Sequence, residues 1–315
     1  MTVFRSLAEI RVNQGSVVAI GNFDGVHIGH REILRRVIAV AHDGGLTPTV
    51  LTFDPHPARV LAPDRAPSMI MTIDQRLRAF ERAGVETTFV LPFSLEFARL
   101  SPAEFAGQVL VQALRTRCVL VGDDFRFGYK QSGNVGTLIE LGHRLGFAVQ
   151  PVAPVLGDRE RVSSTAIRQL ISKGRVSKAC RMMVAPFALE GAVVRGFGIG
   201  SKQTVPTLNL AAENELLPGT GVYVTRTRDE ASGRSWNSIT NVGYRPTFEG
   251  RELTVETFLL DPAPASAPER IEVQFLSRIR EERRFETPEA LKAQILRDAG
   301  AAMRFHRRLT RLNVG

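Results

Sequence analysis

The chain has very few cysteines and no long apolar run. Of its 315 residues only Cys118 and Cys180 are cysteines, and they stand far apart. This excludes a disulfide framework and a zinc site of clustered ligands. The chain also lacks an apolar run of about eighteen residues, the length that a membrane-spanning helix needs, and residues 1–5 lack the pattern of a signal peptide. We therefore expect a cytoplasmic protein that does not associate with membranes.

The chain also lacks recognisable nucleic-acid-binding motifs, although it is basic. It contains 41 Lys and Arg against 32 Asp and Glu, and residues 277–315 hold ten basic against five acidic residues. Only Phe285 and Phe305 are aromatic in this basic segment, without a regular interleaving of aromatic and basic residues. Attraction of phosphorylated small molecules, or a solvated helix face, therefore explains the segment more simply. We expect no nucleic-acid partner and no assembly beyond a weak homo-oligomer.

Two parts of the chain differ in periodicity, which predicts two domains. From residue 16 to about 180, short apolar runs alternate with helical patterns. This predicts an α/β domain with a doubly wound parallel sheet and ligands at the carboxyl ends of its strands. From about residue 187, strands follow one another without long helices between them, which predicts a small antiparallel β-barrel. A final helix is expected over 288–308, with Leu291, Ile295, Ala299 and Ala302 buried.

The most informative motif is residues 21–30, GNFDGVHIGH, between the predicted strand 17–20 and a stretch of helical periodicity. Its glycines let the backbone approach a ligand, and a helix start offers free N–H groups to phosphate. His27 and His30 lie on one face of the first turn and can donate hydrogen bonds to phosphate oxygens. The alternative is a Gly-rich turn with two surface histidines. The motif predicts a nucleoside triphosphate site.

Further polar motifs follow other predicted strands. Residues 52–57, TFDPHP, follow the strand 49–53, and residues 122–128, GDDFRFG, follow the strand 118–121. In the second of these motifs, the two phenylalanines could flank a flavin or adenine ring or pack in the core. Residues 161–168, RVSSTAIR, combine hydroxyls that cap a helix with an arginine that can bind phosphate in bidentate fashion, although alone such a pattern is usually only a cap.

The barrel half has motifs suited to phosphate as well. Residues 195–202, RGFGIGSK, form a Gly-rich loop whose N–H groups can bind phosphate. Residues 205–210, VPTLNL, follow it, and residues 241–248, NVGYRPTF, lie further on. Glu256 lies on a predicted strand among apolar neighbours, where it could act as a general base or simply face solvent.

Together these motifs resemble, in order, those of the bacterial bifunctional riboflavin kinase/FAD synthetase family, over residues 15–308. The resemblance implies an FMN adenylyltransferase domain over residues 1–183 and a riboflavin kinase domain over residues 184–315. The kinase would convert riboflavin and ATP to FMN, and the transferase would convert FMN and ATP to FAD with release of pyrophosphate. Both steps would require Mg²⁺.

The resemblance also implies roles for individual residues. The residues expected to take part in catalysis are His27, His30, Arg168 and Glu256. Metal ligands are expected at Asp124, Thr207 and Asn209. The residues expected to bind nucleotide, phosphate or flavin are Gly21, Asn22, Phe23, Asp24, Gly25, Gly29, Asp124, Phe125, Phe127, Ser163, Ser164, Thr165, Gly196, Gly198, Gly200, Lys202, Thr207, Asn209 and Arg280.

The kinase half departs from the family pattern at several positions. Thr204 replaces a glycine, Phe258 replaces a histidine, and Ala267-Pro268 and Val184-Ala185 replace Tyr-Gly and Gly-Arg pairs. These departures leave an alternative open, in which the chain is only an FMN adenylyltransferase with an impaired flavin-binding kinase domain. A second alternative is a non-catalytic flavin-binding or nucleic-acid-binding regulator, motivated by the net charge of +9.

Overall fold

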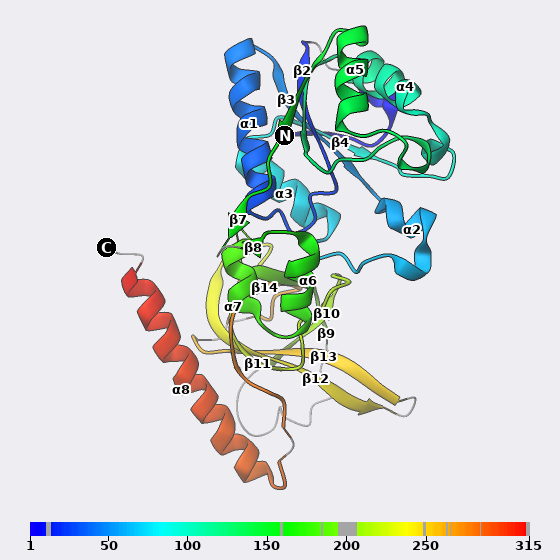
Figure 1. Cartoon of the computed structure of the whole chain (residues 1–315). Coiled ribbons are helices and arrows are strands. Elements are labelled where there is room, and N and C mark those ends of the chain that lie inside the picture. The colour runs from blue at the N-terminus through cyan, green and yellow to red at the C-terminus, as the bar shows by residue number, and fades with distance from the viewer. Residues whose placement is uncertain are drawn as a thin grey trace. The chain divides into compact units, whose positions relative to one another are not determined.

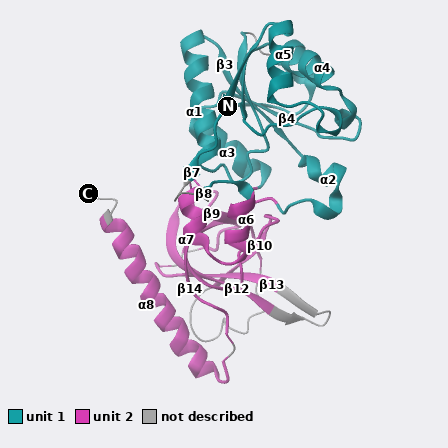
Figure 2. Cartoon of the chain, viewed as in Figure 1, with its two compact units in different colours: residues 1–68, 72–164 teal, residues 69–71, 165–315 magenta. Residues whose placement is uncertain are grey.

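The structure is a computed structural model with two compact units (Figures 1 and 2). Unit 1 comprises residues 1–68 and 72–164, and unit 2 comprises residues 69–71 and 165–315. The predicted functional boundary between residues 183 and 184 is a separate matter and stays a prediction. The structure describes residues 1–10, 14–157, 160–183, 185–194, 207–247, 250–262, 264, 266–283 and 285–312.

Unit 1 contains a six-stranded parallel sheet in the order β1-β4-β3-β2-β5-β6. From the central strand β2 the chain passes to β3 and β4 on one side and then returns to β5 on the other. The predicted doubly wound sheet is thus confirmed, with a switch point between β2 and β5. The strands are β1 (Thr2–Phe4), β2 (Ser16–Ile20), β3 (Thr47–Phe53), β4 (Thr87–Leu91), β5 (Thr116–Gly122) and β6 (Ala148–Val152).

Helices connect the strands of this sheet, and a cap fixes the start of several of them. Thr72 and Gln75 form a reciprocal capping box at the start of α3. The helices are α1 (Ile28–Gly44), α2 (Pro57–Leu61), α3 (Ile73–Ala83), α4 (Pro102–Glu104), a π-helical segment (Phe105–Ala113) and α5 (Val135–Leu145). The short strands β7 (Leu156–Gly157) and β8 (Glu160–Arg161) pair antiparallel after the sheet.

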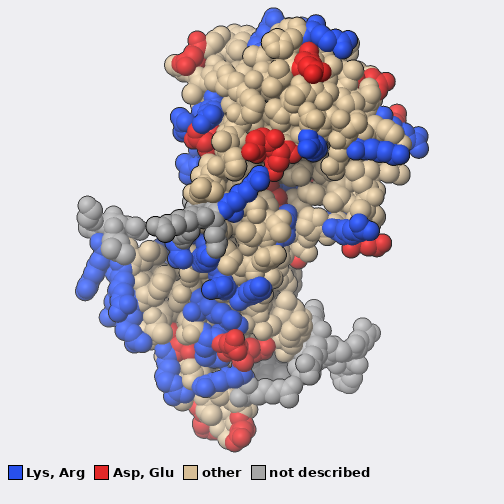
Figure 3. Space-filling view, in the orientation of Figure 1, with Lys and Arg blue, Asp and Glu red and all other residues tan. Residues whose placement is uncertain are grey.

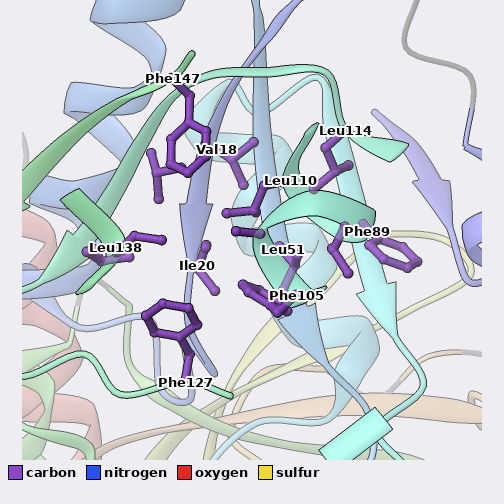
Figure 4. Packing of buried hydrophobic residues seen from close by; sticks show 14 of the residues in the cluster. Val18, Ile20, Leu51, Phe89, Phe105, Leu110, Leu114, Phe127, Leu138 and Phe147 are labelled. Carbon is purple, nitrogen blue, oxygen red and sulfur yellow. The ribbon is translucent and has the colours of Figure 1, made fainter. Parts of the chain in front are cut away.

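Apolar side chains form the core of unit 1. All five residues of β2 are buried, as expected of a parallel strand covered on both faces. Figure 4 shows Val18 and Ile20 of β2 beside Leu51 of β3, with Phe105 and other side chains around them. Each such side chain, when fully buried, contributes about 1.5–3 kcal/mol relative to exposure. This packing holds the central strand, and with it the position of the loop that follows.

Unit 2 contains a closed antiparallel barrel in the order β10-β13-β12-β11-β14-β9. The predicted barrel is confirmed, and the segment that begins at Thr207, which the sequence indicated only as a motif, forms one of its strands. The strands are β9 (Phe187–Val194), β10 (Thr207–Ala212), β11 (Gly221–Asp229), β12 (Ser235–Thr247), β13 (Gly250–Leu259) and β14 (Arg270–Arg280). The helices α6 (Ser164–Ser172) and α7 (Val176–Met182) precede the barrel.

The barrel interior carries a chain of hydroxyl groups as well as apolar side chains. Thr225 is hydrogen-bonded to Ser238 and to Thr240, each at 2.8 Å, and Thr240 is bonded to Thr257 at 2.9 Å. All four residues are completely buried. Because every hydroxyl in this chain has a partner, the desolvation of these groups is compensated.

The last helix, α8 (Pro288–Leu312), packs against the outer face of the barrel. Ala299 and Ala302 form a buried cluster with Val224 of β11 and Ile239 of β12. The prediction that Leu291 is buried was wrong, because Leu291 is 42% exposed. The helix instead turns polar side chains inward near its start, which an apolar pattern cannot reveal.

The opposite face of α8 is basic (Figure 3). Its Lys and Arg side chains are exposed, as expected of a solvated helix face. These exposed residues are Lys292, Arg297, Arg304, Arg307, Arg308 and Arg311.

Candidate functional site

In unit 1 the predicted motifs meet at one edge of the sheet. Residues 21–30 follow β2, residues 54–57 follow β3, and residues 122–128 follow β5. Because β3 and β5 are the two neighbours of β2 and all three run parallel, these segments lie at adjacent carboxyl ends. This is where open α/β sheets bind ligands.

The two histidines of residues 21–30 are stacked on each other at the start of α1. Their ring centroids lie 3.6 Å apart with an interplanar angle of 15°. His27 is the N-cap residue, and its Nδ1 accepts a hydrogen bond from the backbone N–H of His30 at 3.3 Å. Gly29 leaves room for this stack, since a Cβ there would lie 3.2 Å from the His27 ring. Phe23 contacts His30 edge to face at 5.1 Å.

Both imidazoles are neutral near pH 7. Burial lowers the pKa of His27 from 6.5 to about 4. Burial also lowers the pKa of His30 well below its ordinary value, and the neighbouring His27 lowers it further. The pair therefore offers N–H donors rather than positive charges, and the charge complement for a phosphate at this point comes from the start of α1.

The loop before these histidines has an unusual backbone and unpaired polar atoms. Phe23 and Val26 have positive φ angles of 50° and 31°, which are costly for residues other than glycine. Asn22 Nδ2 lies 3.1 Å from Nε2 of His56. Among the described residues, Asn22 Oδ1 and His30 Nδ1 are buried atoms without a hydrogen-bond partner. Such atoms need a partner from outside the chain, either water or a ligand.

Arg76 of α3 supports this loop, and the motifs did not reveal it. Its Nη1 donates hydrogen bonds to the carbonyl oxygen of Asn22 at 2.9 Å and to Oγ1 of Thr52 at 3.2 Å. Arg76 as a whole is 2% exposed. The available signal was its position one helical turn before the buried Phe80, on the inward face of an amphipathic helix.

The segment RVSSTAIR is held partly by the same loop. Ser164 Oγ donates a hydrogen bond to the carbonyl oxygen of Asp24 at 2.8 Å, and Asp24 is 1% exposed. Ser163 is partly buried, whereas Thr165 is exposed. Arg168 is partly buried on α6 in unit 2. Their contacts with a ligand remain predictions.

Asp124 and the two aromatic residues after it lie in different surroundings. Asp124 is exposed and forms an ion pair with Arg161, with Oδ2 2.6 Å from Nη2. Phe125 and Phe127 are stacked with centroids 5.5 Å apart. Phe127 is buried and belongs to the apolar core, and Phe125 packs against that core. Packing thus accounts for much of both rings, and their contact with a ligand remains a prediction.

In unit 2 the register of the strands brings the predicted kinase residues together. Asn209 of β10 lies directly opposite Glu256 of β13, and Glu256 lies directly opposite Asn241 of β12. Directly opposed residues point to the same face of a sheet. Thr207 lies two residues before Asn209 on the same strand, so it points to that face as well. The sequence identified three of these residues, but it gave no role to Asn241.

Glu256 points to the outer face of the barrel. Its neighbours Val255 and Thr257 are buried in the barrel interior, whereas Glu256 itself is partly buried. Phe258, on the same face, packs against the cluster beneath α8. Glu256 therefore faces outward, as one of the two alternatives from the sequence predicted. It lies between Asn209 and Asn241, a set that we call the polar row, and beside the apolar cluster beneath α8. Its catalytic role remains a prediction.

Arg280 ends the same row, and a carboxylate engages it. It is paired in register with Val222 of β11, which is paired with Asn241. Its Nε and Nη2 lie 3.0 and 2.9 Å from Oδ2 of Asp298, a residue of α8 that the sequence analysis did not single out. The predicted phosphate-binding residues Gly196, Gly198, Gly200 and Lys202 lie outside the described residues.

Comparison with protein families finds one match for each half of the chain. Residues 9–166 match the FAD synthetase family, and residues 183–306 match the riboflavin kinase family. The two matches occur in the order of the two sets of motifs.

Curated relatives are similar over nearly the whole chain. A protein of Haemophilus influenzae is 34% identical over 94% of this chain and 96% of its own length. One of Escherichia coli K12 is 34% identical over 93% of each chain, and one of Pseudomonas fluorescens is 36% identical over 96% of this chain and 97% of its own. All three are named bifunctional riboflavin kinase/FMN adenylyltransferase.

A solved structure has the same fold throughout. It is described as a macrolide-efflux protein from Streptococcus pneumoniae, and it is 29% identical with a TM-score of 0.86 over 96% of this chain and 98% of its own. Among the described residues of the present chain, no helix is both long and apolar enough to cross a membrane. The similarity therefore extends to the fold.

Proposed function

Because this chain belongs to the family of bifunctional riboflavin kinase/FMN adenylyltransferases, we propose that it makes FAD from riboflavin in two ATP-dependent steps. It is an enzyme with a riboflavin kinase domain and an FAD synthetase domain. Riboflavin and ATP give FMN and ADP at the barrel. FMN and a second ATP then give FAD and pyrophosphate at the parallel sheet.

The register of β10, β13 and β12 is the observation that carries the bifunctional proposal. It aligns Asn209, Glu256 and Asn241 across three adjacent strands, so that amide groups flank the carboxylate on both sides. The alternative of a transferase with an impaired kinase rests on the departures at Thr204, Phe258 and Ala267-Pro268. Thr204 lies outside the described residues, and the alignment is present with Phe258 in place. The comparisons do not favour that alternative.

In the kinase step, the proposed role of Glu256 is that of a general base. Its carboxylate accepts the proton of the riboflavin 5′-hydroxyl as that oxygen attacks the γ-phosphorus of ATP, and ADP leaves. Thr207 and Asn209 position the phosphates on the same face. The step forms no covalent enzyme intermediate, so its rate depends on alignment and charge neutralisation.

In the transferase step, a phosphate oxygen of FMN attacks the α-phosphorus of ATP and pyrophosphate leaves. The first turn of α1, with the neutral His27 and His30, donates hydrogen bonds to the triphosphate. Arg168 and the hydroxyls of Ser163 and Ser164 bind phosphate oxygens. No protein nucleophile takes part.

Magnesium fits the oxygen-rich donors that the chain provides. No group of three or more His, Cys, Asp and Glu able to hold a metal occurs among the described residues. Mg²⁺ is commonly held by one or two protein oxygens together with substrate phosphates and water, so Thr207 and Asn209 are suitable ligands. When bound, it would neutralise charge on the transferring phosphoryl group. Asp124 also has suitable oxygens, but a metal there would compete with Arg161.

Several wider expectations remain part of this proposal. We infer that the functional boundary lies between residues 183 and 184, and that the enzyme works in the cytoplasm. Its partners are small molecules rather than nucleic acid or membrane, and any homo-oligomer is weak. Binding of nucleic acid at physiological salt would contradict this part of the proposal.

A flavin product assay tests the proposed function. The full-length protein is incubated with riboflavin, ATP and Mg²⁺, and the flavins are separated by chromatography. FMN is expected first and FAD later. If FAD forms from supplied FMN but riboflavin remains unchanged, the chain is a transferase only. If neither product forms under either condition, the proposed function is wrong.

A further inference from the structure

A buried ion pair fixes the last helix to the strand end beside the proposed kinase site. The Asp298 side chain is 4% exposed. Its Oδ2 accepts a hydrogen bond from Nε of Arg280 at 3.0 Å and lies 2.9 Å from Nη2 of the same arginine. Its other oxygen, Oδ1, accepts a hydrogen bond from Nε2 of Gln294 at 2.7 Å. Both oxygens of the carboxylate are thus engaged, which is the condition for burying such a charge at moderate cost.

Gln294 extends this network to two further arginines. It is 9% exposed, and its Oε1 accepts hydrogen bonds from Arg283 and Arg297. Arg280 and Arg283 both lie against the ring of Phe285, with centroid distances of 5.6 and 4.8 Å. The network therefore joins the end of β14, the segment after it and the N-terminal half of α8.

Burying these charged and polar groups has a desolvation cost, which attachment of the helix alone does not require. Apolar residues of similar volume would hold two packed surfaces together at least as well, since a buried ion pair rarely stabilises a protein more than such residues do. An ion pair with fixed hydrogen bonds, however, specifies one geometry. This suggests that the exact placement of α8 matters more than its adhesion.

The side chain of Phe258 connects the attached part of α8 to the surroundings of Glu256. Ala299, the residue after Asp298, forms the buried cluster with Ala302, Val224 and Ile239, and Phe258 packs against that cluster. Phe258 is two residues from Glu256 on the same face of β13. A shift of α8 would therefore change the surroundings of the carboxylate without changing any residue of the polar row.

We propose that Asp298, with Gln294, is a positioning residue of the kinase site that holds Arg280 and α8 so that the outer barrel face beside Glu256 keeps its reactive arrangement. The inference rests on the proposed kinase function of unit 2. It assigns Asp298 no contact with substrate, and its effect passes through Arg280 and the packing of Phe258.

The test uses the full-length protein with the variants Asp298→Asn and Asp298→Glu. Glu289→Gln is the matched control, because Glu289 is an exposed carboxylate of the same helix. Riboflavin phosphorylation is measured as kcat and KM over a range of pH, and FAD formation from supplied FMN is measured on the same samples. For Asp298→Asn we expect kcat of the kinase to fall about 10- to 100-fold, as small misplacements near reacting groups do.

Three further readouts separate positioning from simple destabilisation. The pH dependence of kcat should shift in Asp298→Asn, because the surroundings of Glu256 change, while FAD formation stays within about two-fold of the wild type. Asp298→Glu should recover part of the lost kcat. Should Asp298→Asn fail to fold, Gln294→Leu removes the hydrogen bond to Oδ1 of Asp298 without altering Arg280, which is itself a predicted binding residue, and it should give the same selective loss.

Two results would overturn the inference. One is an Asp298→Asn protein that phosphorylates riboflavin at the wild-type rate with an unchanged pH profile. The other is a parallel loss of FMN and FAD formation that follows the fraction of unfolded protein. A wild-type protein that forms no FMN would instead contradict the proposed kinase function, so the two failures are distinguishable.

Discussion

The two units of this chain build their sites in different ways. In unit 1 the functional residues stand in loops beyond the ends of buried strands, and the loop after β2 has strained residues at Phe23 and Val26. In unit 2 they stand on the strands themselves, and pairing between β10, β13 and β12 brings them together. A local segment can therefore carry most of the first site, whereas the second exists only once the barrel has closed.

The surroundings of the two sites also differ, since an apolar core supports the first and polar networks lie around the second. The loop of unit 1 rests on an apolar core and on the buried Arg76, with stacked histidines that are neutral at pH 7. The barrel has a hydroxyl chain inside and an ion-pair network outside. The first site should respond to changes in one loop, and the second to changes in strand register and helix placement.

The largest expected effect comes from removing the proposed general base. Glu256→Gln should lower riboflavin phosphorylation by about 10²- to 10⁴-fold, the usual contribution of a general base. FAD formation from supplied FMN should remain within about two-fold, because Glu256 has no role in the proposed transferase step. Glu269→Gln, an exposed glutamate before β14, is the control. Equal loss of both activities in Glu256→Gln would break the distinction between the units.

The reciprocal change is His30→Asn. Loss of the imidazole removes a hydrogen-bond donor to the triphosphate. This should lower FAD formation by about 10²- to 10³-fold while leaving FMN formation nearly unchanged. His42→Asn is a matched control, since His42 lies on the same helix with an exposed side chain. Chromatography of the flavin products measures both activities. Wild-type FAD formation in His30→Asn would exclude this histidine from the reaction.

A third change tests the support of the loop. Arg76→Gln removes the donor to the carbonyl of Asn22 and to Thr52, so we expect unfolding of unit 1 to become easier by about 2–4 kcal/mol. FAD formation should fall with it, and FMN formation should not. Arg82→Gln, on the exposed face of α3, serves as the control. Urea unfolding followed by circular dichroism measures the stability, and an unchanged midpoint would show that Arg76 is dispensable.

Acid should also distinguish the units. Between pH 6.5 and about 4 the unfolded chain protonates His27 while the folded chain does not, so the free energy of unfolding falls as pH falls through this range. The lowered pKa of His27 corresponds to a decrease of about 3 kcal/mol in the free energy of unfolding across this pH range. In the barrel, burial lowers the pKa of His306 in the same direction. Unit 1, with two such histidines, should lose more of its free energy of unfolding in acid than unit 2.

Unfolding followed separately in each unit, at pH 7 and at pH 5, checks this difference in acid sensitivity. His27→Asn keeps a side-chain acceptor for the His30 N–H and removes the titrating ring, so it should reduce the acid sensitivity of unit 1. A larger loss of stability in unit 2 than in unit 1 on acidification to pH 5, or unchanged acid sensitivity in His27→Asn, would contradict this explanation.

The sequence predicted the two architectures because their periodicities are strong. It missed β1, whose three residues are too few for a pattern, and it missed β10 as a strand because the motif around Thr207 suggested only a ligand-binding element. The prediction for Leu291 failed for a physical reason. The inward face of α8 includes Gln294 and Asp298, and a pattern of apolar residues cannot indicate a face that polar pairs complete.

The site of unit 1 was more predictable than that of unit 2, because a local segment forms the first and strand pairing forms the second. Residues 21–30 act as one local segment, so spacing alone placed His27 and His30 together, but it could not reveal Arg76 from a distant helix. Asn209 and Glu256 were expected only through the family resemblance. Their direct opposition, and the presence of Asn241 beside them, depends on strand register, which tertiary structure sets.

The most direct measurement of the central claim, that two independent sites act in sequence, is a mixing experiment. Glu256→Gln and His30→Asn proteins are each supplied with riboflavin, ATP and Mg²⁺, alone and together. We predict that the first alone leaves riboflavin nearly unchanged, that the second alone stops at FMN, and that the mixture forms FAD. Absence of FAD from the mixture, while each variant retains its other activity, would contradict the claim.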